Sequence, residues 1–281
     1  MTSSLFAALL GCLQGATEFL PISSSGHLVL AQHLLHVRHE ALLFDVWLHF
    51  GTLLAIFVVL RRPVGRLVRG MWRGIVEGIP HPFLFMKRPE GADTYLVWLV
   101  ILASIPTAII GFSFKDLFEK LFEGNIRLVG IAFLFTAFLL FLTKFRKGGD
   151  GSGGKGIGIT PLQALLIGAI QGIAIIPGVS RSGSTISLAL LLGIARRDAG
   201  EFSFLIVIPA IGGAMILQTL QGIGALSDVQ FLASALIGMA TAFGVGVFAL
   251  KFLLRLVNQG SFYRFSFYCF GMGVICLWIG R

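Results

Sequence analysis

Residues that together could activate a nucleophile lie close to one another near the N-terminus. Gln14 and Glu18 are four positions apart, so on a helix their side chains share one face. Pro21 is expected to end that helix, which leaves three hydroxyls at the start of the next one: Ser23, Ser24 and Ser25. Serine at a helix N-terminus caps free N–H groups, and such N–H groups also bind anions. His27 follows one turn later, and a serine hydroxyl beside an imidazole and a carboxylate is typical of an activated nucleophile.

A second polar stretch, residues 177–185, carries the complementary charge. Pro177 and Gly178 interrupt one helix, and Arg181 lies at the start of the next. The guanidinium of arginine is a permanently charged planar fork that suits phosphate oxygens. With the free N–H groups of the helix end, three hydroxyls would complete a phosphate cradle: Ser180, Ser182 and Thr185.

The composition indicates the environment of these residues. Of 281 residues, 56% are hydrophobic and only 12% are charged, whereas a soluble domain has about 25% charged residues. There are too few polar residues to cover a soluble core of this size, so a lipid bilayer must supply the apolar surroundings. Helices that span a bilayer need about 20 apolar residues. Six runs have or approach that length: 42–60, 95–111, 126–143, 204–220, 229–250 and 262–280.

The net charge of +9 is distributed along the ends of these runs. Basic residues gather at alternate ends, whereas the segment 115–123 is acidic. The positive-inside rule assigns the basic ends to the cytoplasm. Lipid headgroups are therefore the expected partners of the basic residues, and nucleic acid is not expected to bind.

Two further segments, 4–36 and 160–195, are not among the six predicted spans, whose basic ends alternate along the chain. Each is apolar at both ends and broken near its middle by a Pro/Ser/Gly cluster, so each is predicted to be a re-entrant helix–turn–helix pair. Irregular backbone at membrane depth is tolerated only where it is buried in protein or lines a cavity, so the two breaks indicate a site. The Gly-rich stretch 148–158 is predicted to be a flexible cytoplasmic linker.

The two halves of the chain also resemble each other. The same interval separates a Gln-Gly pair from a Ser-Gly pair in both, at positions 14 and 25 and again at 171 and 182. Residues 1–147 and 159–281 would each hold one re-entrant pair and three spans, and an odd number of spans forces opposite orientation. The predicted fold is therefore an all-α polytopic membrane protein, with about six spanning helices plus two re-entrant pairs in an inverted-topology repeat.

Each polar residue also has a purely structural interpretation. The serines could only cap helices, His27 could be a packing residue, and Arg181 could extend to the membrane surface. Glu18 is harder to explain in this way, because a carboxylate within a spanning region costs several kcal/mol and usually marks function. The clustering of these groups favours a site for phosphoryl transfer, in which positioning and charge stabilisation dominate.

Little indicates a cofactor. Three cysteines without CxxC spacing lie in apolar sequence, which predicts packing residues and neither a disulfide framework nor a zinc site: Cys12, Cys269 and Cys276. No organic cofactor is predicted. A divalent cation, Mg²⁺ or Ca²⁺, that bridges Glu18 and a phosphate is compatible with the pattern, because no second basic residue lies beside Arg181.

The pattern Gln14-x-x-x-Glu18, followed by Pro21-Ile-Ser-Ser-Ser-Gly-His27 and by residues 177–185, closely resembles the undecaprenyl-diphosphate phosphatase family (BacA/UppP). The resemblance covers essentially the whole chain and includes Glu201-Phe-Ser-Phe. It implies hydrolysis of undecaprenyl diphosphate, a polyprenyl diphosphate lipid, to the monophosphate carrier of bacterial envelope synthesis. It also implies tolerance of bacitracin, which sequesters the diphosphate, and a multi-pass protein of the bacterial inner membrane whose site faces the periplasm. Membrane lipids are further expected partners, and a homodimer is a candidate assembly.

Carried over by position, the resemblance together with the residue chemistry yields two predicted sets. The catalytic residues are Glu18, Ser24, His27 and Arg181. The substrate- and phosphate-binding residues are Gln14, Ser23, Ser25, Gly178, Ser180, Ser182 and Thr185. The first position of the family pattern is Glu or Gln, and the Gln14 found here makes a two-carboxylate metal site weaker. Many members have Arg after the Tyr of the last span, whereas this chain has Cys269 after Tyr268. Arg264, about one turn earlier, is a candidate substitute for that arginine.

Two mechanisms and a second function stay open at this stage. Ser24 could attack the terminal phosphorus while His27 takes its proton, after which water hydrolyses the phosphoserine; alternatively, His27 is the nucleophile and Glu18 orients it. Inverted repeats with broken helices are also typical of transporters, so a lipid-phosphate carrier or flippase is the alternative function. The type-2 phosphatidic-acid phosphatases are excluded, because Ser187 occupies the position of their nucleophilic histidine.

Overall fold

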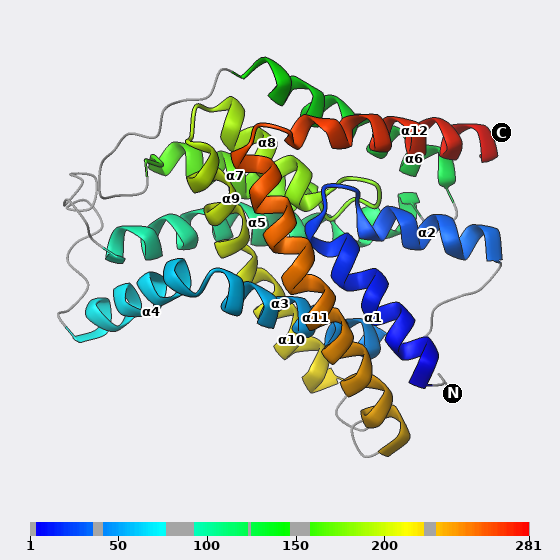
Figure 1. Ribbon diagram of the computed structural model, residues 1–281, viewed down its shortest axis with the longest axis horizontal. Coiled ribbons are helices and arrows are strands. Elements are labelled where there is room, and N and C mark those ends of the chain that lie inside the picture. Colours follow the sequence, from blue (N-terminus) through cyan, green and yellow to red (C-terminus); the bar gives the residue numbers. More distant parts are fainter. Residues whose placement is uncertain are drawn as a thin grey trace.

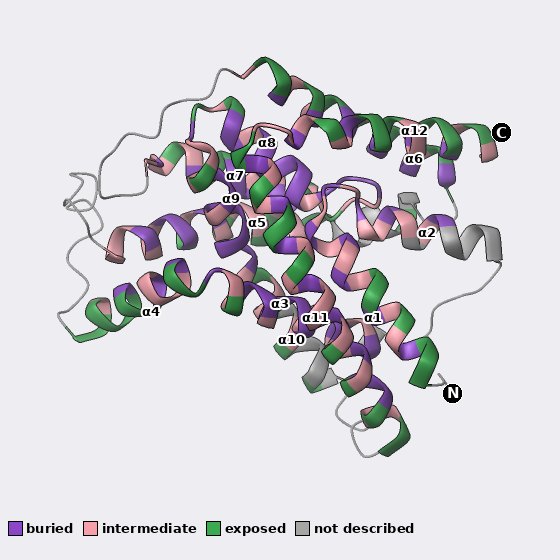
Figure 2. Ribbon diagram, viewed as in Figure 1, coloured by how far each residue is buried: buried purple, intermediate pink, exposed green. Residues whose placement is uncertain are grey.

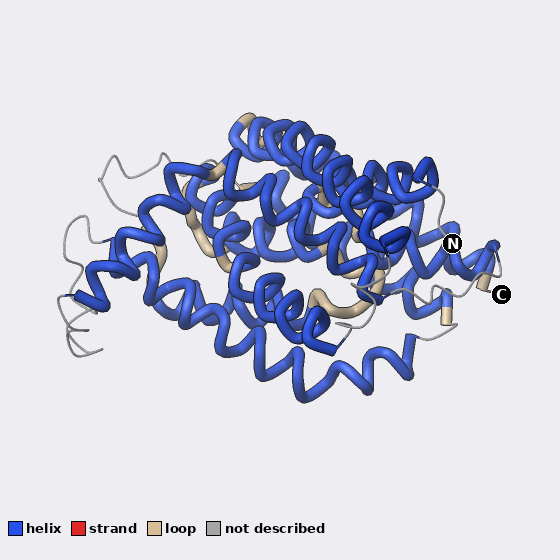
Figure 3. Tube along the Cα trace, turned by 90° about the horizontal axis from the view of Figure 1, so that it is seen from below, coloured by secondary structure: helices blue, strands red, loops and turns tan. Residues whose placement is uncertain are grey.

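The computed structural model describes residues 4–35, 42–76, 93–122, 125–146, 158–221 and 229–280, and every regular element within them is a helix. The all-α prediction is therefore confirmed for this part of the chain. The two termini lie at the same end of the molecule (Figures 1 and 3). Nearly all of the predicted linker 148–158 falls outside the described residues, and so do the carboxylate side chains of the acidic segment: Asp116, Glu119 and Glu123.

The first half of the chain contains two helices separated by a short turn, then four longer or more polar ones. They are α1 (Ser4–Phe19), α2 (Ser24–Leu35), α3 (Leu42–Val59), α4 (Arg61–Val76), α5 (Asp93–Phe122) and α6 (Ile126–Leu142), with a 3-10 turn at Thr143–Phe145. The break between α1 and α2 includes Pro21, which cannot continue a helix because it lacks an N–H group. Asn125 caps α6, since its side-chain oxygen accepts from the N–H of Leu128 at 3.2 Å.

The second half follows a similar order. Its helices are α7 (Pro161–Ile173), α8 (Arg181–Leu191), α9 (Arg196–Leu205), α10 (Val207–Gln221), α11 (Val229–Asn258) and α12 (Phe265–Ile279), with a 3-10 turn at Phe262–Arg264. A capping box starts α7: the Thr160 hydroxyl accepts from the N–H of Gln163 at 3.3 Å, and the Gln163 side chain accepts from the N–H of Thr160 at 2.8 Å. Pro161 occupies the first helical position, where its missing N–H group has no cost.

Four segments in the described residues are long and apolar enough to cross a membrane: Asp93–Phe114, Ile126–Phe145, Val229–Asn258 and Phe262–Ile279. They coincide with four of the six predicted spans. A fifth arises if Phe44–Val59 and Arg61–Val76 are taken together, although these two helices are bent by 91° at the break between them. The predicted span 42–60 is thus α3, and the basic segment after it is a separate helix.

The predicted span 204–220 is not one continuous helix. It begins inside α9 and crosses a break at Ile206 before α10. Pro209 explains the break, because it has no N–H group to donate to the carbonyl of Leu205 and its ring crowds that carbonyl. This segment is not among the described helices that meet the length criterion for a span.

Close helix packing depends on glycine. Gly15 of α1 lies against the backbone of α11, where a Cβ atom would stand 2.6 Å from the carbonyl oxygen of Ala242. Gly168 of α7 lies closer still to α5, since a Cβ atom there would overlap the carbonyl oxygen of Ala103. Small residues let membrane helices approach backbone to backbone. The first helix of each half therefore packs on a long helix, α1 on α11 and α7 on α5.

Burial increases toward the middle of the molecule, where the helix breaks lie, whereas the outward faces of α6, α11 and α12 are exposed (Figure 2). Large apolar side chains occupy these outward faces, such as Phe138, Phe248 and Trp278. In water such a surface would be unfavourable, but hydrocarbon solvates it. The exposed apolar helices identify a membrane protein.

Candidate active site

The two polar turns, one between α1 and α2 and the other between α7 and α8, lie against each other. The Ser182 hydroxyl donates to the carbonyl of Leu20 at 3.3 Å, and the N–H of Gly178 donates to the Ser23 hydroxyl at 3.1 Å. A Cβ atom on Gly26 would stand 2.8 Å from the Cα of Gly178. The structure therefore brings the two polar turns into contact, although they are far apart in the sequence.

Two of the predicted phosphate-binding hydroxyls are helix caps. The Ser23 hydroxyl accepts from the N–H of Gly26 at 3.2 Å, and the Ser180 hydroxyl accepts from the N–H of Gly183 at 3.1 Å. Both serines are buried. Ser25 lies beside the first cap, with its hydroxyl 3.4 Å from that of Ser23. Ser23 and Ser180 thus shape the turns and fix where α2 and α8 begin.

The packed pair α6 and α12 holds both turns in place. Thr136 of α6 donates to the carbonyl of Gly178 at 3.1 Å and accepts from the N–H of Ser180 at 3.0 Å. Cys269 of α12 donates to the carbonyl of Pro21 at 3.1 Å. The α7–α8 turn is therefore hydrogen-bonded to α6, and the α1–α2 turn to α12. Because α6 and α12 pack against each other, the N-termini of α2 and α8 are held in fixed relative positions.

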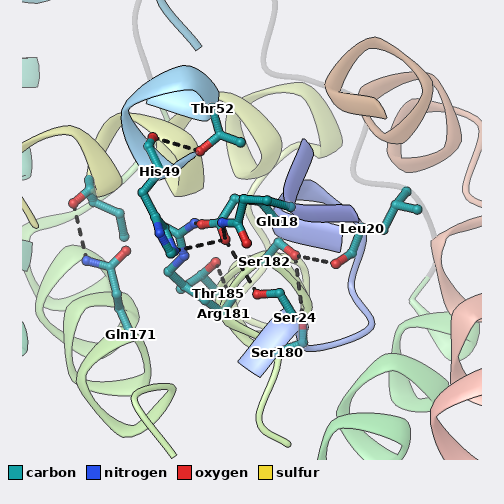
Figure 4. A network of polar contacts seen from close by, with 12 residues as sticks. Glu18, Leu20, Ser24, His49, Thr52, Gln171, Ser180, Arg181, Ser182 and Thr185 are labelled. Atoms are coloured by element: carbon teal, nitrogen blue, oxygen red, sulfur yellow. Dashed lines mark hydrogen bonds and ion pairs between the residues drawn. The ribbon is translucent and has the colours of Figure 1, made fainter. Parts of the chain in front are cut away.

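Glu18 is the centre of the polar network (Figure 4). Its side chain is only 7% exposed, and Arg181 donates to one carboxylate oxygen. The other oxygen accepts from the Gln14 amide at 2.9 Å and from the Ser24 hydroxyl at 3.5 Å, and His49 Nε2 lies 3.6 Å from it. A buried carboxylate requires this degree of compensation, because an unpaired charge in an apolar interior is very costly.

Arg181 points into the cluster from the first residue of α8 (Figure 4). Its side chain is 19% exposed, and its guanidinium is paired with Glu18. Thr185, one turn later, donates its hydroxyl to the Arg181 carbonyl at 2.9 Å. Arg181 therefore places a permanent positive charge beside the N-terminus of α8, where backbone N–H groups also favour an anion.

His49, on α3, is a residue of this cluster that the sequence analysis did not identify. Its Nδ1 lies 2.8 Å from the carbonyl of Asp45, so this nitrogen carries the hydrogen and donates. Its Nε2 therefore faces Glu18, and the histidine side chain is 40% exposed. A histidine inside an apolar run is itself a signal for function, because ionisable residues are rare within spanning segments. That signal was available in the sequence.

His27 lies apart from Glu18. Its Nδ1 is 2.8 Å from the carbonyl of Ser23 and its Nε2 is 2.6 Å from the hydroxyl of Tyr268, so Nδ1 donates and Nε2 accepts from the tyrosine. The two rings are stacked with centroids 5.7 Å apart. Among the described residues, the hydrogen-bond partners of His27 are therefore Ser23 and Tyr268. The histidine beside Glu18 is His49.

Comparison with known proteins shows the family of this chain. The family model described as bacitracin resistance protein BacA matches residues 7–275. The chain belongs to this family. A protein of Desulfosudis oleivorans named undecaprenyl-diphosphatase is 44% identical over 273 residues, covering 97% of both chains. Proteins of the same name from Desulforapulum autotrophicum and Korarchaeum cryptofilum are 41% and 38% identical, over at least 96% of each chain.

The structure shows what Gln14 and Cys269 contact. Gln14 donates its amide N–H to Glu18, so it supports this carboxylate. Cys269 is buried and bound to the turn at Pro21. Arg264 is exposed at the start of α12, and no contact between it and the cluster is found among the described residues. The structure thus gives no support for Arg264 as a substitute.

The described side chains of this BacA family member do not form a metal site by themselves. Among them, no group of three His, Cys, Asp or Glu residues could hold an ion. Glu18 is the carboxylate of the cluster, and it is already paired with Arg181. Mg²⁺ usually binds through one or two carboxylates together with substrate phosphates and water. A divalent cation that bridges Glu18 and a phosphate therefore stays a prediction.

Gly178 is expected to be essential for the stability of the second turn. Its φ is +96°, a conformation that strains other residues, and a Cβ atom there would stand 2.5 Å from the Val129 carbonyl oxygen. The variant Gly178→Ala should lose about 1–3 kcal/mol of stability from the backbone conformation alone, seen as a lower melting temperature in detergent. Gly244→Ala is the matched control, because nothing lies within 4 Å of its Cβ position. A Gly178→Ala protein as stable as that control would contradict the assignment.

Proposed function

We propose that this chain is an undecaprenyl-diphosphatase, which hydrolyses undecaprenyl diphosphate to undecaprenyl phosphate and phosphate. The observation that carries the proposal is the buried Glu18–Arg181 pair at the meeting point of two capped helix N-termini. The relatives that bear this name match nearly the whole chain. By consuming the diphosphate that bacitracin sequesters, the activity would confer bacitracin resistance and return the lipid carrier to cell-wall synthesis.

The site is built to hold a diphosphate. Arg181 supplies a planar guanidinium, and the N-termini of α2 and α8 supply backbone N–H groups. Glu18 pairs with this guanidinium and so fixes its position. A phosphate bound by Arg181 would compete with Glu18 for the guanidinium N–H groups. A part for Ser25, Ser182 and Thr185 in phosphate binding stays a prediction.

Ser24 is the proposed nucleophile. Its oxygen attacks the terminal phosphorus, a new P–O bond forms, the anhydride P–O bond breaks, and undecaprenyl phosphate leaves. The serine proton passes to His27 or to Glu18; Glu18 is the group that Ser24 contacts in the structure, and His49 supports it. Water then hydrolyses the phosphoserine. The alternative in which His27 is phosphorylated requires its Nε2 to leave the Tyr268 hydroxyl.

Phosphate release from a polyprenyl diphosphate by the purified protein tests this function. Ser24→Ala and His27→Ala are each expected to lower kcat at least about 100-fold, the usual loss for a nucleophile or a general base. Brief reaction with substrate labelled on the terminal phosphate should leave label on Ser24 in a slow variant. Label on His27 would select the alternative, and label on neither would indicate direct attack by water. A carrier or flippase would move the lipid without releasing phosphate.

We also propose the finer membrane arrangement: two re-entrant pairs, α1–α2 and α7–α8, in an inverted-topology repeat. The reciprocal packing of α1 on α11 and of α7 on α5 supports it, as do the matched caps Ser23 and Ser180. Gln171, the counterpart of Gln14, instead donates to the carbonyl of Ile206 at 3.2 Å. The proposed location is the bacterial inner membrane with the site facing the periplasm, and a homodimer stays a prediction.

A further inference from the structure

Helix α4 presents three different faces along its length, each with residues three or four positions apart. The first face is buried against the protein and consists of Pro63, Leu67 and Gly70. Gly70 fits tightly there, because a Cβ atom would meet the backbone of Asp93 and stand 2.8 Å from the backbone nitrogen of Thr94. Leu67 and Gly70 therefore fix α4 to the first turn of α5.

The second face of α4 is apolar and exposed. It consists of Val68, Met71, Trp72 and Ile75, followed by Val76 at the end of the helix. Trp72 is 67% exposed and Ile75 is 74% exposed. Contiguous apolar side chains of this size are unfavourable in water. Tryptophan is the residue most typical of the boundary between lipid and water, where its ring is buried and its N–H group stays hydrated.

The third face of α4 is basic. Its arginines are Arg62, Arg66, Arg69 and Arg73, and the helix contains no acidic residue. Arg66 and Arg69 pair with Asp93, through Nε–O distances of 3.1 and 3.2 Å. Arg62 and Arg73 are exposed and have no carboxylate partner among the described residues. Within the described residues, these two permanent charges are therefore not neutralised, and both side chains are exposed to an external anion.

The position of α4 matches the edge of the bilayer. Asp93 is the first residue of an apolar helix long enough to span, so it marks the level at which that span begins. α4 contacts this residue through both Gly70 and its arginines. Its axis is bent by 91° from the apolar α3, so it does not continue in the direction of that helix. In Figure 1, α4 lies at one end of the molecule, beside the beginning of α5.

We propose that α4 is an interfacial helix that binds anionic phospholipids. Trp72 and Ile75 enter the outer part of the acyl region, and Arg62 and Arg73 bind headgroup phosphates of a lipid such as phosphatidylglycerol. Amphipathic helices with apolar and arginine faces of this kind lie in the plane of the membrane surface, and anionic lipids strengthen their binding. This lipid site is separate from the proposed active site and does not depend on the hydrolytic function.

Fluorescence quenching tests the position of the apolar face. The full-length protein and its Trp72→Phe variant are each placed in nanodiscs of phosphatidylcholine with phosphatidylglycerol. The difference between their tryptophan fluorescence spectra is the emission of Trp72. Lipids brominated near the headgroup end of the acyl chains should quench this difference signal, and aqueous iodide should not. Quenching by iodide alone would overturn the proposal, because Trp72 would then be exposed to water and would lie on a surface suited to a soluble partner rather than to lipid.

Native mass spectrometry of the detergent-solubilised protein, titrated with phosphatidylglycerol or phosphatidylcholine, tests the basic face. The double variant Arg62→Gln/Arg73→Gln should bind phosphatidylglycerol about 25-fold more weakly, since each arginine at an anionic surface contributes about fivefold. Its binding of phosphatidylcholine should not change.

The charge-matched control is Lys251→Gln/Arg255→Gln, which removes two exposed charges from the end of α11. It should keep the native preference for phosphatidylglycerol. Equal loss in both double variants would mean that net charge alone attracts the lipid, and an absence of preference in the native protein would exclude the site. Either result would overturn the proposal. Phosphate release measured on the same preparations separates a failure of this proposal from a failure of the proposed enzymatic function.

Discussion

Replacing Arg181 with lysine is expected to lower kcat/KM for a polyprenyl diphosphate by about 100-fold or more. Lysine keeps the positive charge but loses the planar fork that can hold two oxygens at once. It also changes the geometry of the pair with Glu18, which now involves a guanidinium N–H group. Steady-state phosphate release at several substrate concentrations would measure the effect. The loss should appear in kcat as well as in KM, because charge develops during phosphoryl transfer.

Arg197→Lys is the matched control for this substitution. Arg197 lies on α9, is 72% exposed and pairs with Glu201 four residues later. An exposed pair of this kind contributes little, so activity should stay close to that of the native protein. If Arg181→Lys retained native activity as well, a point charge would be sufficient, and the diphosphate would have to be held mainly by other groups.

Replacing Glu18 with leucine is expected to destabilise the protein by about 3 kcal/mol and to abolish phosphate release. The substitution leaves Arg181, only 19% exposed, without its counter-charge. It also removes the acceptor used by Gln14 and Ser24, so both polar side chains lose a hydrogen bond. Thermal unfolding in detergent, followed by intrinsic fluorescence, would measure the loss of stability.

The double variant Glu18→Leu/Arg181→Met separates the lost charge pairing from lost packing. Removing both charges should restore part of the stability. Replacing a whole buried ion pair with apolar residues often costs little stability, whereas removing one partner leaves an unpaired buried charge. Glu201→Leu is the comparison, because it leaves behind Arg197, which is 72% exposed and therefore solvated; the lost pair should cost at most about 1 kcal/mol. A double variant no more stable than Glu18→Leu alone would show that the loss does not arise from the unpaired arginine.

The long apolar runs were the most predictable part of the fold. Four of the six predicted spans coincide with long apolar helices, because hydropathy over about 20 residues is a local property of the chain. The run 204–220 is not one continuous helix, since Pro209 lies in it and a count of apolar residues does not detect a proline break. Helix α4 was also absent from the prediction, although the spacing of its arginines and apolar residues is that of an amphipathic helix.

The sequence by itself determined the membrane environment, the breaks at Pro21 and Pro177, and the chemical groups that gather there. Those features depend on composition and on residues close together in the chain. Tertiary structure alone decided which groups meet. Glu18 and Arg181 are 163 positions apart, and His27 and Tyr268 are 241 positions apart. Such pairs form only when helices from both halves pack, so no local pattern could show that His49, rather than His27, is the histidine beside Glu18.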